Sequence, residues 1–323
     1  MVVTTGFDVG MGHRLVTAWN ESVPGDPITE ERFRRLVLLD PNFDPEGLRI
    51  AHDGDEIVGA VYAVRRTVAM TADDLEPEQG WIPFLFTTPA HRRRGIGGRL
   101  LDEALDWLRG HGRRQADFSS YTPNYIQPGI DRERHPEAAG LLESRGFRTL
   151  YRASAMDMNL VGHTIPEKVR DRIAALTADG YTFGTPDADE LVPLIRLAHE
   201  EFNPDWARAI REAAVAGIPL NRIVVARAPG GRVIGWGMCA GYESVIDRFG
   251  PFGVLADRRG LGLGEVLLHL CLERMRALGA HNAWFLWTGR ESPAGHLYLK
   301  TGFTITRTFD VMRAPLHPRK DQS

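Results

Sequence analysis

The chain has 323 residues, of which 43% are hydrophobic and 25% charged, a composition typical of a soluble globular protein with two domains. Its 39 Lys and Arg residues nearly balance 42 Asp and Glu residues, so the net charge of −3 argues against nucleic acid or an anionic membrane as a partner. Two cysteines exclude a disulfide framework, and we expect a cytoplasmic protein without a metal site or a membrane span.

The first half of the chain predicts a mixture of strands and helices. Two apolar stretches on either side of Asp-Gly-Asp predict a hairpin of residues 48–52 and 57–65. A short apolar run predicts a strand at 81–86, and a 3.6-residue apolar period from Leu100 to Leu108 predicts an amphipathic helix. A segment rich in turn formers follows at 121–131, and then a short helix ends at Gly146.

The second half predicts the same kinds of element. The predicted elements are strand 181–185, helices 189–202 and 205–216, hairpin 222–228 with 233–240, strand 249–254, a helix with apolar positions from 266 to 275, strand 283–288, helix 293–301 and strand 303–311. The pattern breaks at 159–166. We therefore predict domains 1–160 and 161–323, each with a mixed α/β sheet covered by helices on both faces.

Two motifs recur in the same order in both halves. The pattern Arg-x-x-Gly-x-Gly-x-x-Leu occurs at 92–100 and again at 259–267, each time between a predicted strand and a predicted helix. The pattern Gly-Phe after a short helix occurs at 146–147 and at 302–303. The spacing between the two motifs is 11 residues longer in the first half, which matches the turn-rich segment. The repetition indicates two copies of one domain.

The repeated arginine–glycine motif predicts a site for a pyrophosphate. Glycines at a strand-to-helix turn allow the main chain to approach an anion, and helix N–H groups and arginines bind it. The Gly-Lys-Ser/Thr of a nucleoside-triphosphate loop does not follow either copy. A dinucleotide fingerprint would need a glycine where Leu100 and Glu265 stand, and the hairpin-rich order does not suit a Rossmann sheet.

Both motifs resemble those of the GNAT family of N-acetyltransferases, and the resemblance covers nearly the whole chain. One departure is Ala256, which stands where the family usually has proline. The family's pyrophosphate site and its pantetheine groove between two splayed strands, here 249–254 and 283–288, imply acetyl-CoA as co-substrate. The implied cofactor-binding residues are Phe86, Arg92, Arg94, Gly95 and Gly97 in the first half and Val254, Arg259, Gly260, Gly262 and Gly264 in the second.

The same resemblance assigns a proton donor for the leaving thiolate. In the family this is a tyrosine four residues before the Gly-Phe glycine, a position held by Tyr298 in the second half and by Leu142 in the first. Leucine cannot donate a proton, so we expect catalysis in the second half. The first half then binds cofactor without turnover or is structural, unless Tyr121 or Tyr125 compensates.

The base and the acceptor site are less well marked in the sequence. Glu243 and, as an alternative, Asp247 lie just upstream of strand 249–254 and are candidate bases. Glu201 and Asp205 are candidate ligands of a cationic acceptor, and Trp287 could stack on a sugar ring. The competing interpretation of each is a solvated carboxylate or a core tryptophan.

We therefore expect an acetyl-CoA-dependent N-acetyltransferase that acts on the primary amine of a small molecule such as an amino sugar like glucosamine, as a monomer or homodimer. A mycothiol-synthase-like acetyltransferase is the enzymatic alternative. A non-catalytic acyl-CoA binding or sensing protein is a second alternative, and a regulatory module that docks a partner through the segment 121–136 is a third.

Overall fold

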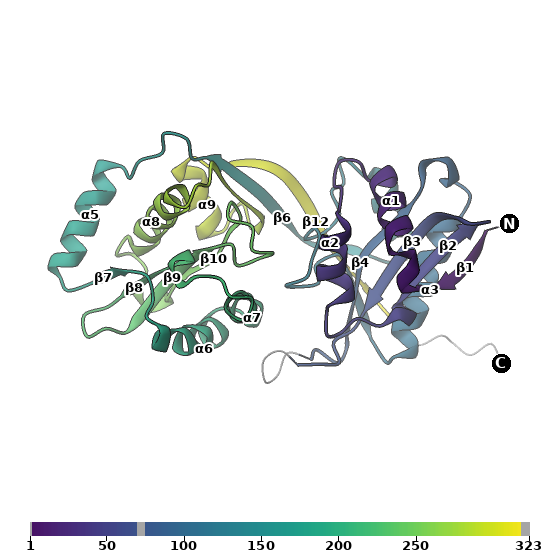
Figure 1. Cartoon of the computed structure of the whole chain (residues 1–323), viewed down its shortest axis with the longest axis horizontal. Helices are drawn as coiled ribbons and strands as arrows, with labels where there is room; N and C mark the ends of the chain where they lie inside the picture. The colour runs from purple at the N-terminus through teal and green to yellow at the C-terminus, as the bar shows by residue number, and fades with distance from the viewer. Residues whose placement is uncertain (1, 70–74, 318–323) are drawn as a thin grey trace. The chain divides into compact units, whose positions relative to one another are not determined.

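A computed structural model describes residues 2–69 and 75–317 (Figure 1). The chain forms two compact units. The first unit contains the residues up to Ala153 and the segment that begins at Thr308, and the second unit is Ser154–Arg307. This division differs from the predicted boundary at 160 because the last strand of each half ends in the other half's sheet.

The first unit is built on a mixed sheet with strand order β1-β2-β3-β4-β5-β12. These strands are β1 (Val3–Gly6), β2 (Leu48–Asp53), β3 (Glu56–Val64), β4 (Gln79–Thr87), β5 (Gln115–Phe118) and β12 (Thr304–Pro315). β4 and β5 run parallel, and β12 pairs antiparallel with β5. The predicted hairpin of β2 and β3 and the predicted strand at 81–86 are confirmed.

Helices cover both faces of the first sheet. The helices are α1 (Gly12–Ser22), α2 (Glu30–Phe33), α3 (Ile96–Gly110) and α4 (Pro136–Ser144), with short 3₁₀ segments at Val9–Met11, Pro45–Gly47 and Pro89–His91 and a π-helical segment at Arg34–Leu38. Because side chains alternate along a strand, Tyr62 and Val64 of β3 pack with Leu15 of α1, whereas Val61 and Ala63 pack with Leu100 of α3.

The second unit contains a four-stranded sheet, β10-β9-β8-β7, and a separate pair of β6 and β11. The strands are β6 (Arg148–Asn159), β7 (Thr182–Gly184), β8 (Ile223–Arg227), β9 (Val233–Cys239), β10 (Phe249–Val254) and β11 (Asn282–Thr288). The helices are α5 (Glu167–Ala178), α6 (Leu191–Glu201), α7 (Pro204–Val215), α8 (Leu263–Ala277) and α9 (Pro293–Thr301), with 3₁₀ segments at Ala188–Glu190, Leu220–Arg222 and Ala256–Arg258.

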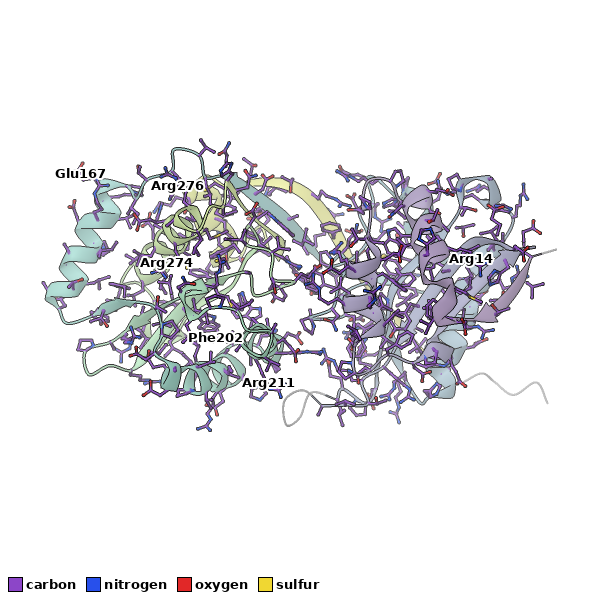
Figure 2. All side chains as sticks on the ribbon, in the orientation of Figure 1. Arg14, Glu167, Phe202, Arg211, Arg274 and Arg276 are labelled. Atoms are coloured by element: carbon purple, nitrogen blue, oxygen red, sulfur yellow. The ribbon has the colours of Figure 1, made fainter. Side chains whose placement is uncertain are left out.

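Two apolar cores lie on opposite faces of the four-stranded sheet. Val224 of β8 belongs to a core with α5, α8 and α9, whereas Val225 belongs to a core with α6 and α7. Phe202, which follows α6, packs edge-on against Trp236 at 4.7 Å (Figure 2). The predicted helices and strands of this half are therefore present, and α5 is an element that periodicity did not predict.

The terminal strands of the two halves are exchanged. Met312 of β12 pairs with Phe118 of β5 in the first unit, and Ala283 of β11 pairs with Met158 of β6 in the second. β6 and β12 are each 12 residues long, so one end of each strand belongs to each unit. A repeat in sequence therefore does not correspond to two separately closed sheets.

Candidate functional site

The two arginine–glycine loops, residues 92–97 and 259–264, have the same main-chain conformation. Gly95 and Gly262 each have φ of 80° and directly precede a 15-residue helix, α3 or α8. Neither helix start is capped by a side-chain hydrogen bond. The left-handed φ favours glycine, and an uncapped first turn offers N–H groups and the positive end of the helix dipole to an anion.

A cavity lies beside the first loop, where β4 and β5 separate. Their parallel pairing ends at Ile82 and Phe118, whereas β4 continues to Thr87. The space between them has a volume of about 540 Å³. Its walls come from β4, the first loop, the start of α3, α4, the end of α1 and the segment 118–130. We call this space the first-unit cavity.

Four of the five residues predicted for cofactor binding in the first half line this cavity. They are Phe86, Arg92, Gly95 and Gly97, while Arg94 is exposed and does not contribute to the lining. The lining is apolar toward β4 and α4 and basic at the first loop. This distribution suits a ligand with an apolar arm and an anionic end.

Two arginines at the rim are held in place by neighbouring groups. Arg92 donates from Nη2 to the carbonyl of Ser22 at 2.8 Å and from Nε to the carbonyl of Thr87 at 3.3 Å. Arg145 of the α4 C-terminus donates to both oxygens of Asp102, and this hydrogen bonding raises the pKa of Arg145. Both guanidinium groups remain charged and supply the positive potential that a phosphate requires.

The position that distinguishes the two halves has opposite surroundings in the two units. Leu142 is 1% exposed and lines the first-unit cavity. Tyr298, its counterpart on α9, is 7% exposed, and its ring lies within about 6.2 Å of the rings of Phe249, Phe252 and Phe285. Burial raises the pKa of Tyr298, so its hydroxyl keeps its proton throughout the neutral range.

Comparisons with known proteins agree with this geometry. A model of the acetyltransferase (GNAT) family matches residues 14–122, and a GNAT acetyltransferase domain model matches residues 219–305. The chain belongs to the GNAT acetyltransferase family. It contains two GNAT domains in tandem, and its two motif repeats are the conserved parts of those domains.

Relatives and solved structures extend the likeness beyond the two family matches. The chain is 28% identical to the mycothiol acetyltransferase of Saccharomonospora viridis over 71% of this chain and 72% of that protein. A tandem GNAT protein from the clavulanic acid biosynthesis pathway aligns with a TM-score of 0.69 at 16% identity, covering 98% of this chain and 99% of that one.

A structure of a fungal multi-domain β-N-acetylglucosaminidase, which includes a glucosamine N-acetyltransferase region, aligns with a TM-score of 0.81 at 17% identity. The alignment covers 97% of this chain but 38% of that chain. At this identity the likeness shows a shared fold. None of the helices in the described part of the chain is long and apolar enough to cross a membrane.

In the second GNAT domain, the candidate base Glu243 is engaged in an ion pair. Its Oε1 accepts from Arg248 Nη1 at 2.7 Å, and both side chains are less than 10% exposed. The guanidinium also lies over the rings of Tyr242 and Trp284, at 4.7 and 5.4 Å. A carboxylate held by a buried arginine is a poor proton acceptor because the arginine stabilises its charged form.

The second loop is packed against α5. Arg172 of α5 lies 3.4 Å from the position of a Cβ on Gly262. Glu265 in the first turn of α8 pairs with Lys168 at 2.9 Å and with Lys300 at 3.5 Å, and the hydrogen bond from Lys168 lowers the pKa of Glu265. The other residues predicted here, Val254, Arg259, Gly260 and Gly264, occupy the end of β10 and the loop as expected from the motif.

The candidate acceptor residues do not form a cluster with the second loop. Glu201 is exposed at the end of α6, and the main-chain N–H of Asp205 donates to the cap of α7, Asn203 Oδ1, at 2.8 Å. Trp287 is half-buried on β11. Their role as acceptor ligands stays a prediction. In the described residues, no three His, Cys, Asp or Glu side chains are grouped to hold a metal ion.

Sequence analysis did not identify Ser119 or the first-unit cavity. The signal was present in the 11 additional residues between the two motifs of the first half. We interpreted them as a turn-rich insertion, but they contribute Ser119, Ile126 and Gln127 to the cavity wall. Sequence spacing locates an insertion but does not show which cavity it borders.

Proposed function

We propose that this tandem GNAT protein transfers an acetyl group from acetyl-CoA to the primary amine of a small molecule, and that the first-unit cavity holds the acetyl-CoA. The observation that supports this most directly is the cavity itself. It joins the uncapped helix start at Gly95 to the open edge of β4. The tyrosine motif alone favoured the second domain.

The residues around the cavity fit the parts of acetyl-CoA. The first loop offers main-chain N–H groups for the diphosphate, and Arg92 and Arg145 add positive charge beside it. The edge of β4 beyond Ile82 lacks pairing with β5 and is open to the amide-bearing pantetheine arm. Bound there, acetyl-CoA supplies an activated acyl group, and the chain orients it and excludes water.

For the acceptor we propose an amino sugar. The names of two similar proteins support this class: mycothiol acetyltransferase, at 28% identity, and a glucosamine N-acetyltransferase region, whose similarity rests on fold. A mycothiol-synthase-like reaction remains the enzymatic alternative. A protein that binds acyl-CoA without turnover is the alternative from another class, and it predicts binding with no release of free thiol.

Two measurements test this proposal. Release of CoA thiol is followed with glucosamine, other amino sugars, polyamines, aminoglycosides and amino acids as acceptors. Acetyl-CoA binding is then measured by calorimetry for the wild type and for the matched variants Gly97→Leu and Gly264→Leu. Each substitution places a side chain in the first turn of α3 or α8, at the equivalent position of the two loops.

We expect Gly97→Leu to abolish acetyl-CoA binding and turnover and Gly264→Leu to retain both. Retention of both by Gly97→Leu, with loss in Gly264→Leu, would place the donor in the second domain. Binding without thiol release for any acceptor would favour the sensing protein. Melting curves of both variants show whether a loss reflects unfolding.

A further inference from the structure

The insertion at residues 119–129 is a feature of the first unit that has no counterpart of similar length in the second. β5 ends at Phe118, and the chain returns to the sheet at Ile130, which pairs with Asp310 of β12. In the second unit, β11 ends at Thr288 and α9 begins at Pro293. Because the insertion forms part of the cavity wall, it places groups next to the bound donor that the second domain lacks.

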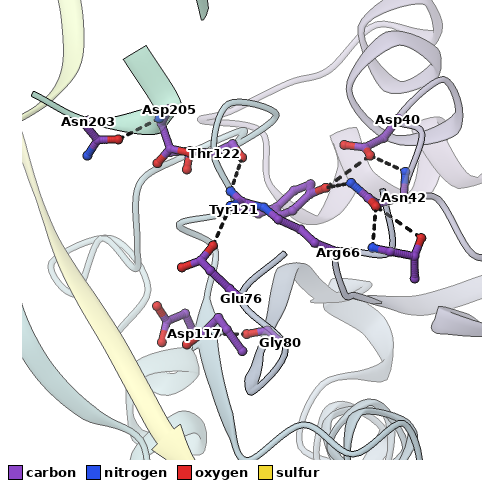
Figure 3. Close-up of polar contacts among 12 residues, drawn as sticks. Asp40, Asn42, Arg66, Glu76, Gly80, Asp117, Tyr121, Thr122, Asn203 and Asp205 are labelled. Carbon is purple, nitrogen blue, oxygen red and sulfur yellow. Dashed lines mark hydrogen bonds and ion pairs between the residues drawn. The ribbon is translucent and has the colours of Figure 1, made fainter. Parts of the chain in front are cut away.

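A buried polar network fixes this insertion to the rest of the first unit (Figure 3). The hydroxyl of Tyr121 donates to Asp40 Oδ1 at 3.2 Å and accepts from Asn42 Nδ2 at 3.2 Å. Arg66 donates to the carbonyl of Thr122 at 2.9 Å. Asp40, Asn42, Arg66 and Tyr121 are each at most 5% exposed. Hydrogen bonds in such a buried network restrict the positions of its members.

Ser119 occupies the point where β4 and β5 begin to separate. Its N–H donates to the carbonyl of Ile82, the last paired residue of β4, at 2.9 Å. Its side chain is 3% exposed and lines the cavity. Its φ is 69°, in the left-handed region that favours glycine. A serine held in this conformation where glycine would fit without strain is typical of a functional site.

The other hydroxyl groups of the cavity lining are placed differently. Ser22 donates its hydroxyl to the carbonyl of Ala18 within its own helix at 2.6 Å. Thr87 lies at the opposite end of the cavity, where its Oγ1 is 3.3 Å from the position of a Cβ on Gly97 in the first loop. Ser119 Oγ donates to the carbonyl of Gln127 at 2.6 Å. Rotation about its Cβ–Oγ bond redirects that single proton without moving the main chain.

We propose that Ser119 Oγ–H is the hydrogen-bond donor to the thioester sulfur in the first domain, in the place of the tyrosine that Leu142 replaces. This inference rests on the proposed function. A diphosphate at the first loop directs the pantetheine arm along β4 toward the junction with β5. The sulfur then reaches the end of the cavity at which Ser119 lies.

The step is balanced in atoms and electrons. The amine nitrogen forms a bond to the carbonyl carbon, the carbon–sulfur bond breaks, and its electron pair stays on sulfur. The amine loses one proton and the sulfur gains one, so the products are the amide and the free thiol. Ser119 stabilises the developing negative charge on sulfur through its hydroxyl proton, which matters because a thiol with a pKa of about 8.5 leaves partly as thiolate.

The experiment compares Ser119→Ala and Ser119→Gly with Ser120→Ala in the full chain. Ser120 is also buried, at 7% exposure, but does not line the cavity. Glycine accommodates the left-handed φ of residue 119 without a side chain, so it separates the loss of the hydroxyl from backbone strain. The measured quantities are kcat with the best acceptor, the dissociation constant of CoA by calorimetry, and the melting temperature.

We expect both Ser119 variants to lower kcat by about 10²–10³, the loss typical of removing one transition-state donor, with little change in CoA affinity. Ser120→Ala should behave as the wild type. Wild-type kcat in both Ser119 variants would overturn this inference. An equal weakening of CoA binding would also overturn it, because a purely structural role predicts that result.

The failure of this inference is distinguishable from that of the proposed function. If the wild type binds CoA in a Gly97-dependent manner but Ser119 variants retain kcat, the donor site stands and Ser119 is not the sulfur's donor. If Gly97→Leu leaves CoA binding unchanged, the first domain is not the donor site and this inference fails with it.

Discussion

Arg313 and Asp117 form a bidentate ion pair between β12 and β5, although 196 residues separate them in the chain. Arg313 Nε donates to Asp117 Oδ1 at 2.6 Å and Nη2 donates to Oδ2 at 2.9 Å. The hydrogen bond from Asp117 raises the pKa of Arg313. The side chain of Asp117 is 9% exposed, so this pair ties the end of the chain to the interior of the first unit's sheet.

Removal of the arginine is expected to destabilise the first unit. Arg313→Ala leaves the buried Asp117 carboxylate without its partner, and an unsatisfied buried acceptor costs about 1–3 kcal/mol. The measurement is the free energy of unfolding in urea. Arg114→Ala is the control, because Arg114 and Glu78 are exposed and pairs of this kind contribute little. Equal stability of the two variants would contradict the expectation.

The exchange of β6 and β12 explains why sequence reasoning located the repeats but not the division into units. The two arginine–glycine loops, their helices and the Gly-Phe pairs depend on local geometry, which composition and period predict. The sheet that receives a terminal strand depends on pairing between distant residues, such as Met312 with Phe118. A strand's own apolar pattern carries no information about which partner it selects.

The Tyr121 hydroxyl is expected to stabilise the insertion of the first unit. Tyr121→Phe removes its hydrogen bonds to Asp40 and Asn42 and leaves the Asp40 carboxylate buried at 5% exposure with fewer donors. We expect a loss of about 1–3 kcal/mol in the free energy of unfolding. Increased proteolysis within residues 119–129, read by mass spectrometry, would locate the change, and wild-type resistance there would argue against this role for the network.

A stacked pair of histidines makes the second unit sensitive to acid. The rings of His163 and His269 lie 5.4 Å apart and nearly parallel, and His269 is 3% exposed. Burial, with a contribution from the neighbouring His163, lowers the pKa of His269 to about 4, and burial also lowers the pKa of His163. The folded state therefore favours neutral imidazoles, whereas the unfolded chain takes up protons below pH of about 6.5.

Because the unfolded state binds more protons in this range, stability should decrease as the pH falls from about 6.5 toward 4. His269→Gln removes one of the two groups and should flatten this part of the curve. The measurement is the urea midpoint of unfolding as a function of pH. An unchanged slope in His269→Gln would show that other groups govern the acid sensitivity.

The candidate site shows a second limit of sequence reasoning. The motif assigned importance to Tyr298 because its hydroxyl can donate a proton, and the replacement by Leu142 counted against the first half. In the structure, the smaller residue borders the cavity and the tyrosine packs among Phe249, Phe252 and Phe285. A motif identifies a functional group, whereas the space around that group depends on the packing of several elements.

The last prediction concerns the domain in which turnover occurs. If the first domain transfers the acetyl group, Tyr298→Phe should leave kcat unchanged, because the lost hydroxyl lies in the apolar core of the second unit. A general acid in the reaction would instead contribute about 10²–10⁴ to the rate. Steady-state kinetics with the best acceptor measures the difference. Ser119→Ala provides the matched comparison, and a large loss confined to Tyr298→Phe would place the chemistry in the second domain.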